Sequence, residues 1–226
     1  MLFAASCGYW QRNPDPTPAP FIADEVKNGI PFASKEPEVY QAEIVLTNYA
    51  GGEKSERVLF TARRGDKLRF DCENKISSLQ SGEDIRFLIY NGKKIYAESQ
   101  TNSAASGDVV NAAKDFLTVE WLNEKHGAKF ENLGAENGLT KYLVSLADAP
   151  NKNSETFIFV DENLKIPVRQ EFYTISGGQK VLVFSMEIRN LRLEADDKLF
   201  ELPKDYRKVS SNEFQKIIRQ EKIKNQ

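Results

Sequence analysis

The sequence has no long apolar run, little histidine and no close pair of cysteines. No stretch reaches the roughly 18 consecutive apolar residues of a membrane-spanning helix. The chain has one histidine, His126, and two cysteines, Cys7 and Cys72. We therefore expect neither a structural nor a catalytic zinc site, because zinc needs clustered Cys and His ligands. The net charge is −2 with both signs interspersed, which argues against a nucleic-acid partner.

Catalytic motifs are missing as well. The chain contains no Gly-x-Ser-x-Gly, no His-Glu-x-x-His and no phosphate-binding loop. His126 stands at the end of an expected helix, where a protonated imidazole favours the helix dipole. The adjacent acids Asp196 and Asp197 fit a turn better than a pair of catalytic carboxylates. We expect no enzymatic activity and no cofactor.

The first twenty residues carry the most informative signal. Small residues lead to Cys7, and a proline-rich spacer follows at residues 13–20. This order is typical of a bacterial lipoprotein, in which the cysteine thiol takes a diacylglycerol and the preceding peptide is removed. We expect residues 1–7 to be the remnant of a lipoprotein signal lipidated at Cys7, and residues 8–36 to be a tether. The alternative is a frayed N-terminus with an ordinary cysteine.

The remaining residues, 37–226, are enough for one domain with a substantial core. A hydrophobic fraction of 40% and an aromatic fraction of 11% support a globular fold. If Cys7 is acylated, Cys72 is expected to be a buried apolar residue on one strand face with Leu68 and Phe70. A Cys7–Cys72 disulfide is the alternative.

From about residue 38 apolar and polar residues alternate, which predicts half-buried strands. The first stripe is Tyr40, Ala42, Ile44 and Leu46, and the stripe on the returning strand is Val58, Phe60 and Ala62. Asn91-Gly92 separates two strand-like runs and predicts a type I′ hairpin. The strand-like runs are 38–46, 57–64, 68–72, 85–90, 93–98, 129–133, 139–146, 156–160, 166–168, 169–175 and 180–191.

Two helices are expected among these strands. Residues 108–125 have a wide apolar stripe that includes Phe116 and Trp121. Residues 211–224 place Phe214, Ile217 and Ile218 on one side, with most of the lysines and arginines on the other. The sum predicts a mostly β (α+β) fold, a curled, incomplete antiparallel β-barrel of about nine to eleven strands. The first helix is the inserted lid and the second is C-terminal.

The second half of the chain also resembles a known family. It has an acidic turn at Asp161-Glu162-Asn163, an apolar-Pro-apolar step around Pro167, a strand pair, and a Phe-x-x-Pro-x-x-Tyr close at Phe200–Tyr206. In this order the motifs resemble the LolA/LolB-like superfamily of bacterial envelope lipoprotein carriers and outer-membrane lipoproteins. The resemblance implies a half-barrel whose hollow receives acyl chains. The family's chaperone members use a key arginine near the front of the barrel. Arg57, Arg63, Arg64 and Arg69 are the candidates here, but no motif selects one of them, so the role is assigned to none.

The leading interpretation is an envelope lipoprotein, anchored in the outer membrane and facing the periplasm, that binds lipid or acyl chains in its cavity and serves lipoprotein or lipid trafficking. Phe116 and Trp121 are the candidate lid residues. The candidate residues of the sheet are Phe70, Phe87, Tyr142, Phe159, Phe172 and Phe184. The alternative is an RseB-like sensory or protein-interaction lipoprotein with an envelope protein partner and no transfer activity. A third possibility is an assembly or cell-surface component without a cavity.

Overall fold

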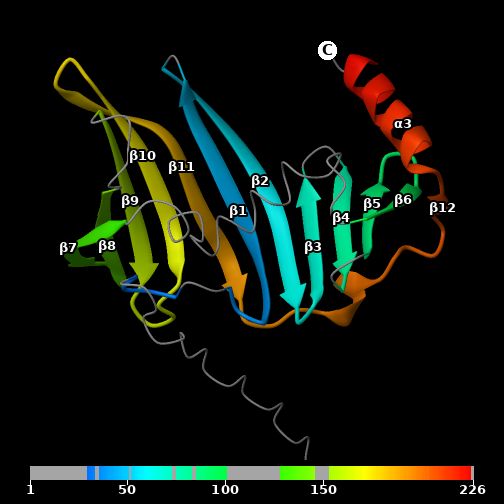
Figure 1. The fold of residues 1–226 in the computed structure, drawn as a ribbon, viewed down its shortest axis with the longest axis horizontal. Helices are drawn as coiled ribbons and strands as arrows, with labels where there is room; N and C mark the ends of the chain where they lie inside the picture. The colour runs from blue at the N-terminus through cyan, green and yellow to red at the C-terminus, as the bar shows by residue number, and fades with distance from the viewer. Residues whose placement is uncertain are drawn as a thin grey trace, which may run out of the picture.

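The computed structural model describes residues 30–33, 36–50, 52–72, 75–82, 85–100, 128–145 and 153–224. These residues form one large sheet, a 3₁₀ helix and an α-helix (Figure 1). The strands are β1 (Val39–Ala50), β2 (Glu53–Arg64), β3 (Lys67–Cys72), β4 (Ile76–Ser81), β5 (Ile85–Tyr90), β6 (Ile95–Gln100), β7 (Lys129–Glu136), β8 (Leu139–Ser145), β9 (Ser154–Asp161), β10 (Pro167–Ser176), β11 (Gln179–Arg192) and β12 (Arg207–Lys208). The helices are η2 (Asp197–Phe200) and α3 (Ser211–Lys224).

The twelve strands lie in the order β12-β6-β5-β4-β3-β2-β1-β11-β10-β9-β8-β7. All neighbours are antiparallel except β12, which runs parallel to β6. The mostly β class and the antiparallel pairing are confirmed. The predicted curled, incomplete barrel of about nine to eleven strands is not, because the twelve strands form one sheet that is neither closed nor strongly curled (Figure 1). A barrel closes only when its end strands pair. Here the end strands are the two-residue β12 and the irregular β7, and they do not pair with each other.

Two hairpins turn through adjacent residues with positive φ, as a type I′ turn requires. They are Asn137-Gly138, between β7 and β8, and Gly177-Gly178, between β10 and β11. The type I′ turn predicted at Asn91-Gly92 is wrong, because β5 and β6 are joined by the four residues 91–94 and the positive φ falls on Lys94. Glycine is needed at Gly92 for packing instead. A Cβ there would lie 2.7 Å from Cζ of Tyr90.

Strand β7 continues through Gly134 to Glu136, past the predicted end of its run at residue 133. Gly134 has a φ of 101°, and the register with β8 shifts between Asn132 and Ala135. The side-chain Oδ1 of Asn132 accepts a hydrogen bond from Gly134 N at 2.8 Å. These features define a β-bulge in the last strand of the sheet.

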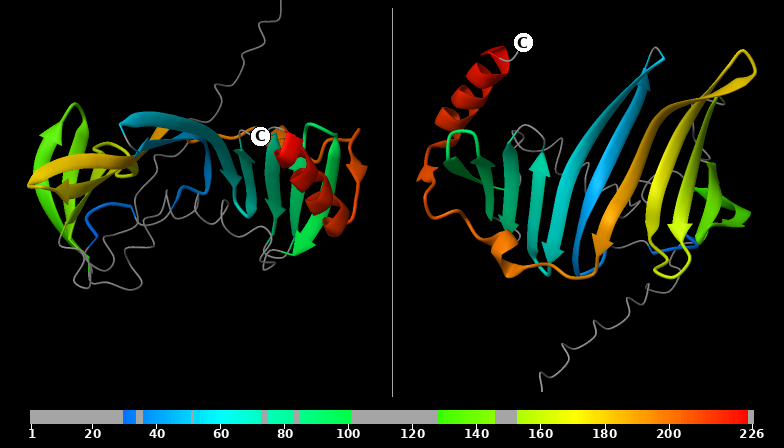
Figure 2. Two further views of the ribbon diagram at one scale, coloured as in Figure 1. Left: turned by 90° about the horizontal axis from the view of Figure 1, so that it is seen from above. Right: turned by 180° about the vertical axis from the view of Figure 1, so that it is seen from behind.

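Different segments of the chain cover the two faces of the sheet, and they do so over different strands (Figure 2). We call the face that carries α3 and residues 30–33 the inner face, and the face crossed by residues 195–206 the outer face. Strand residues alternate between the faces. On β5, for example, Leu88 and Tyr90 pack on the inner side, whereas Phe87 and Ile89 pack on the outer side.

Residues 195–206 cover the outer face of β2–β6. Ala195 and Phe200 are buried there, and Tyr206 packs against the same cluster. Two arginines hold the segment in place: Arg64 Nη2 donates to Ala195 O at 2.6 Å, and Arg69 Nη1 donates to Leu199 O at 2.9 Å. The Phe-x-x-Pro-x-x-Tyr close therefore fixes the end of the chain to the sheet.

The helix α3 covers the inner face at β6. Its bounds coincide with the predicted 211–224. Phe214 is 2% exposed and Ile217 and Ile218 pack beside it, which confirms the predicted apolar stripe. Ser210 Oγ accepts a hydrogen bond from Glu213 N at 3.2 Å and so caps the helix.

Residues 30–33 cover the opposite end of the inner face, over β7–β9. Ile30 and Phe32 are buried, and the Phe32 ring meets Phe130 edge to face with centroids 5.4 Å apart. The end of the expected tether therefore docks on the sheet. Cys7, the rest of residues 1–29 and the expected helix at 108–125 lie outside the described residues.

Candidate functional site

An apolar surface lies in the middle of the inner face, across β1, β2, β3 and β11. We call its seven residues the central cluster: Ile44, Leu46, Leu59, Phe70, Cys72, Phe184 and Met186. Ile44 is 0% exposed and Met186 is 1% exposed. The other clusters of described residues all include side chains from outside the strands, such as Phe32, Phe200 or Phe214. Of the residues that the structure describes, the central cluster contains strand residues alone.

Strand register brings this cluster together. Ile44 stands opposite Leu59 on β2, and Leu46 stands opposite Met186 on β11. Such cross-strand pairs are the elementary contacts of a sheet face. Phe184 then faces Phe172 on β10, with ring centroids 5.6 Å apart and planes inclined by 45°. Phe172 therefore extends the apolar surface by one strand.

Buried polar side chains border the central cluster on the same face. Gln80 and Arg86 stand opposite each other on β4 and β5. Burial lowers the pKa of the Arg86 guanidinium, which nevertheless stays charged. Gln80 Nε2 donates to Gly82 O at 2.9 Å, whereas its Oε1 is buried with no hydrogen-bond partner among the described residues. An apolar surface thus adjoins groups that suit a polar ligand head.

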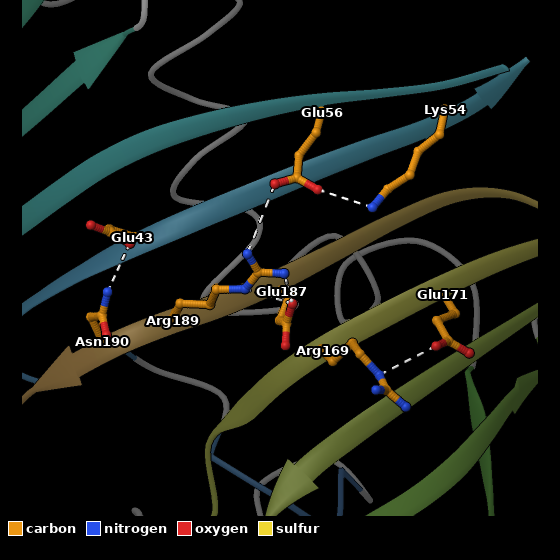
Figure 3. Close-up of polar contacts among 8 residues, drawn as sticks. All are labelled: Glu43, Lys54, Glu56, Arg169, Glu171, Glu187, Arg189 and Asn190. Atoms are coloured by element: carbon orange, nitrogen blue, oxygen red, sulfur yellow. Dashed lines mark hydrogen bonds and ion pairs between the residues drawn. The ribbon is translucent and has the colours of Figure 1, made fainter.

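The outer face over the same strands is charged (Figure 3). Arg189 lies at its centre, with Nη2 2.6 Å from Glu187 Oε2 and Nη1 3.9 Å from Glu56 Oε1. Asn190 Nδ2 donates to Glu43 Oε2 at 2.8 Å. Exposed contacts of this kind contribute little to stability, and they indicate a face in contact with water.

Further along the outer face, cations cover two phenylalanine rings of β9. Lys141 Nζ lies 4.3 Å and Lys180 Nζ 3.8 Å from the Phe157 ring centroid. Arg169 Cζ lies 3.8 Å from the centroid of Phe159. Long basic side chains can shield apolar rings with their methylene stems. Phe157 and Phe159 are accordingly 4% and 8% exposed.

The structure separates the predicted ligand-binding residues. Phe70 and Phe184 belong to the central cluster, and Phe172 adjoins it. Tyr142 lies on the same face but packs under Phe32, 5.6 Å between ring centroids. Phe87 and Phe159 lie on the outer face, against Tyr96 and beneath Arg169. Phe116 and Trp121 lie outside the described residues.

The four candidate arginines are separated in the same way. Arg64 and Arg69 bind the covering segment on the outer face, and Arg63 forms an ion pair with Glu36. Arg57 is exposed and stands opposite Leu46, so the register places it on the inner face beside the central cluster.

Sequence reasoning did not select Ile44, Leu46, Leu59 and Met186 as site residues. The alternation of Ile44 and Leu46 was visible, but the apolar stripe of the next strand, Val58, Phe60 and Ala62, faces the other side. Only the pairing of Ile44 with Leu59 identifies the shared face.

Within the described ranges, no three His, Cys, Asp or Glu side chains lie close enough to hold a metal ion. In the same ranges, no helix is long and apolar enough to span a membrane.

Neither a family model nor a curated protein matches this sequence. Solved structures do match. A LolA superfamily protein from Nitrosomonas europaea is 11% identical, with a TM-score of 0.34, over 74% of this chain and 92% of that chain. A Vibrio parahaemolyticus domain named for outer membrane lipoprotein sorting is 15% identical, with a TM-score of 0.34, over 75% and 92%.

A chain of the Pseudomonas aeruginosa MucA/MucB complex is 11% identical, with a TM-score of 0.38, over 76% of this chain and 58% of that chain. The structural matches of this chain thus include LolA superfamily proteins, at low sequence identity. These matches concern the fold and say nothing about activity.

Proposed function

We propose that this chain is a non-enzymatic lipoprotein of the cell envelope that binds lipid or acyl chains on the inner face of its sheet. The observation that supports this most directly is the central cluster. It is a broad apolar surface built from four strands, and no described helix or loop contributes to it.

The chemistry of such binding is simple. Each methylene moved from water to an apolar surface contributes about 0.8 kcal/mol, so an acyl chain binds without specific polar contacts. Phe70, Phe172 and Phe184 are the proposed contacts from the sheet. The buried Gln80 and Arg86 are the proposed contacts for a polar head, because they border the same surface.

Two parts of the proposal rest on sequence. Phe116 and Trp121, on the expected helix 108–125, would close over the central cluster as a lid. A diacylglycerol on Cys7 would anchor the protein in the outer membrane, facing the periplasm, where the bound lipid or lipoprotein would be handed on. The small residues before Cys7 and the prolines after it support the anchor.

The test is native mass spectrometry, with lipid extraction, of the Cys7→Ser chain purified from a Gram-negative envelope. It is paired with displacement of a fluorescent fatty acid. Phe184→Asp places a charge in the central cluster and should abolish both signals. The matched control is Leu182→Asp, on the same strand and also half-buried, but opposite Tyr173 on the outer face. It should leave binding unchanged.

Circular dichroism establishes that both variants are folded, and Phe184→Ala replaces Phe184→Asp if the charge prevents folding. A clean apo mass together with no probe displacement would contradict lipid binding. The surviving function would then be the alternative, an envelope lipoprotein that binds a protein partner without transfer.

A further inference from the structure

The helix α3 has two opposite faces with different roles. One face, formed by Phe214, Ile217, Ile218 and Glu221, lies towards the sheet and is at least half-buried. The spacing i, i+3, i+4, i+7 places these residues on one side of a helix. The same spacing recurs in Lys216, Arg219, Gln220 and Ile223. We call these four exposed residues the outer ridge.

The charges of α3 are sorted between these faces. Its two acids are engaged with the body of the protein: Glu213 pairs with Arg207 at 3.2 Å, and Glu221 pairs with Lys93 at 3.5 Å. Among the described residues, neither Lys216 nor Arg219 forms an ion pair. The outer ridge is therefore a basic surface without internal compensation.

The end of the helix also exposes apolar surface. Ile223 is 73% exposed, the largest exposed fraction among the large hydrophobic residues that the structure describes. Figures 1 and 2 show that α3 lies beside β6 and extends past the ends of β4–β6. The ridge thus projects from a corner of the molecule, where a large flat surface can reach it.

We propose that the outer ridge docks on the anionic surface of a phospholipid bilayer. Unpaired cations flanking an exposed isoleucine suit the boundary between headgroups and acyl chains. Each basic residue near an anionic surface strengthens binding about fivefold. The ridge does not depend on lipid binding at the central cluster.

The experiment measures co-sedimentation of the full chain, carrying Cys7→Ser so that no acyl group contributes, with vesicles. Vesicles of phosphatidylcholine alone are compared with vesicles containing phosphatidylglycerol. We expect binding to the anionic vesicles only, and a decrease with salt as the Debye length shortens. The charge reversal Lys216→Glu with Arg219→Glu should weaken binding at least about tenfold, and Ile223→Asp should weaken it further.

The matched control reverses two exposed lysines outside α3, Lys129→Glu with Lys204→Glu, which changes the net charge equally. It should bind as the parent does. Equal loss in the control, or equal binding to neutral vesicles, would overturn the proposal. Cross-linking of the ridge to an acidic protein without vesicle binding would overturn it too. If the charge reversal perturbs the helix, Lys216→Gln with Arg219→Gln replaces it. Fatty-acid displacement should be unchanged, which separates this test from that of the central cluster.

Discussion

Glu36 Oε1 lies 2.7 Å from Nη1 of Arg63, an ion pair that ties the chain ahead of β1 to the end of β2. The side chains are 9% and 23% exposed. The second oxygen of Glu36 accepts a hydrogen bond from Tyr40 Oη at 2.7 Å. Arg63 Nε also donates to Gly65 O at 2.9 Å. One carboxylate thus joins three parts of the chain at the edge of the inner face.

We expect Glu36→Gln to lower the free energy of unfolding by about 2 kcal/mol, because it removes the charge from two shielded hydrogen bonds. Urea unfolding measures the change. Glu38 provides the control: it lies 3.6 Å from Arg63 Nη2 but is 79% exposed. Glu38→Gln should change stability by less than about 0.5 kcal/mol. Equal effects of the two substitutions would contradict the role given to Glu36.

The same contact predicts a loss of stability at alkaline pH. Burial raises the pKa of Tyr40 well above 10, and the Glu36 carboxylate raises it further. Because the folded pKa exceeds the unfolded one, the contribution is complete below about pH 10 and declines above it, where the unfolded chain ionises first. We expect the free energy of unfolding to fall by up to about 1.4 kcal/mol per pH unit in this window.

Urea unfolding at about pH 8 and about pH 11 tests this, with Tyr40→Phe as the variant that cannot ionise. Tyr40→Phe should be less stable than the parent near neutral pH and should lose less at high pH. Burial, together with a hydrogen bond to Glu171, also raises the pKa of Tyr173, to about 12. The alkaline loss of stability of Tyr173→Phe therefore serves as the comparison for that of Tyr40→Phe. If Tyr40→Phe had the same alkaline loss as the parent, another group would be responsible.

Phe32→Ala should destabilise the protein by about 3 kcal/mol, since Phe32 is 4% exposed and packs on two rings, Phe130 and Tyr142. Hydrogen exchange should rise in β7 and β8, which the segment covers. The control is Leu133→Ala on β7, where the leucine side chain is 46% exposed. This substitution should change the free energy of unfolding by less than about 0.5 kcal/mol. A small effect of Phe32→Ala would mean that residues 30–33 add little to the fold.

Arg57 and Arg69 should have opposite phenotypes. Arg69→Met removes the hydrogen bond to Leu199 O and the ion pair with Asp71, and should cost about 1–2 kcal/mol with unchanged fatty-acid binding. Arg57→Met should leave stability unchanged but weaken binding of an anionic fatty acid, because Arg57 stands beside Leu46 on the inner face. Urea unfolding and probe displacement, measured on both variants, check this. If both variants changed stability and fatty-acid binding in the same way, the assignment of Arg57 to the inner face and Arg69 to the outer face would be contradicted.

Much of the fold was predictable because its elements have local causes. The bounds 211–224 of α3 follow from its apolar stripe, and the turn at Gly177-Gly178 follows from the need for positive φ. The strand β4 was missed because Ser77, Ser78 and Gln80 are buried polar residues that break the apolar alternation. The two-residue β12 has too little sequence to form any pattern.

The face of the sheet on which each strand side chain lies was not predictable in the same way. In β5 the run Phe87-Leu88-Ile89-Tyr90 is apolar throughout because both faces are covered, by residues 195–206 outside and by α3 inside. A pattern without polar positions cannot assign Phe87 to a face. The Asn-Gly pairs show a similar limit: Asn137-Gly138 forms the tight turn, whereas Asn91-Gly92 is part of a longer loop in which Tyr90 occupies the space beside Gly92.

The bulge at Gly134 has a consequence for how copies of this protein behave when crowded. An open sheet has two edge strands, and a strand of another molecule can pair with either one, which is the usual first step of fibril growth. At one edge of the sheet, β12 is only two residues long. At the other edge, the β-bulge at Gly134, held by the hydrogen bond to Asn132, interrupts the regular backbone pattern of β7. Both edges are therefore poor templates for strand addition between copies of the protein.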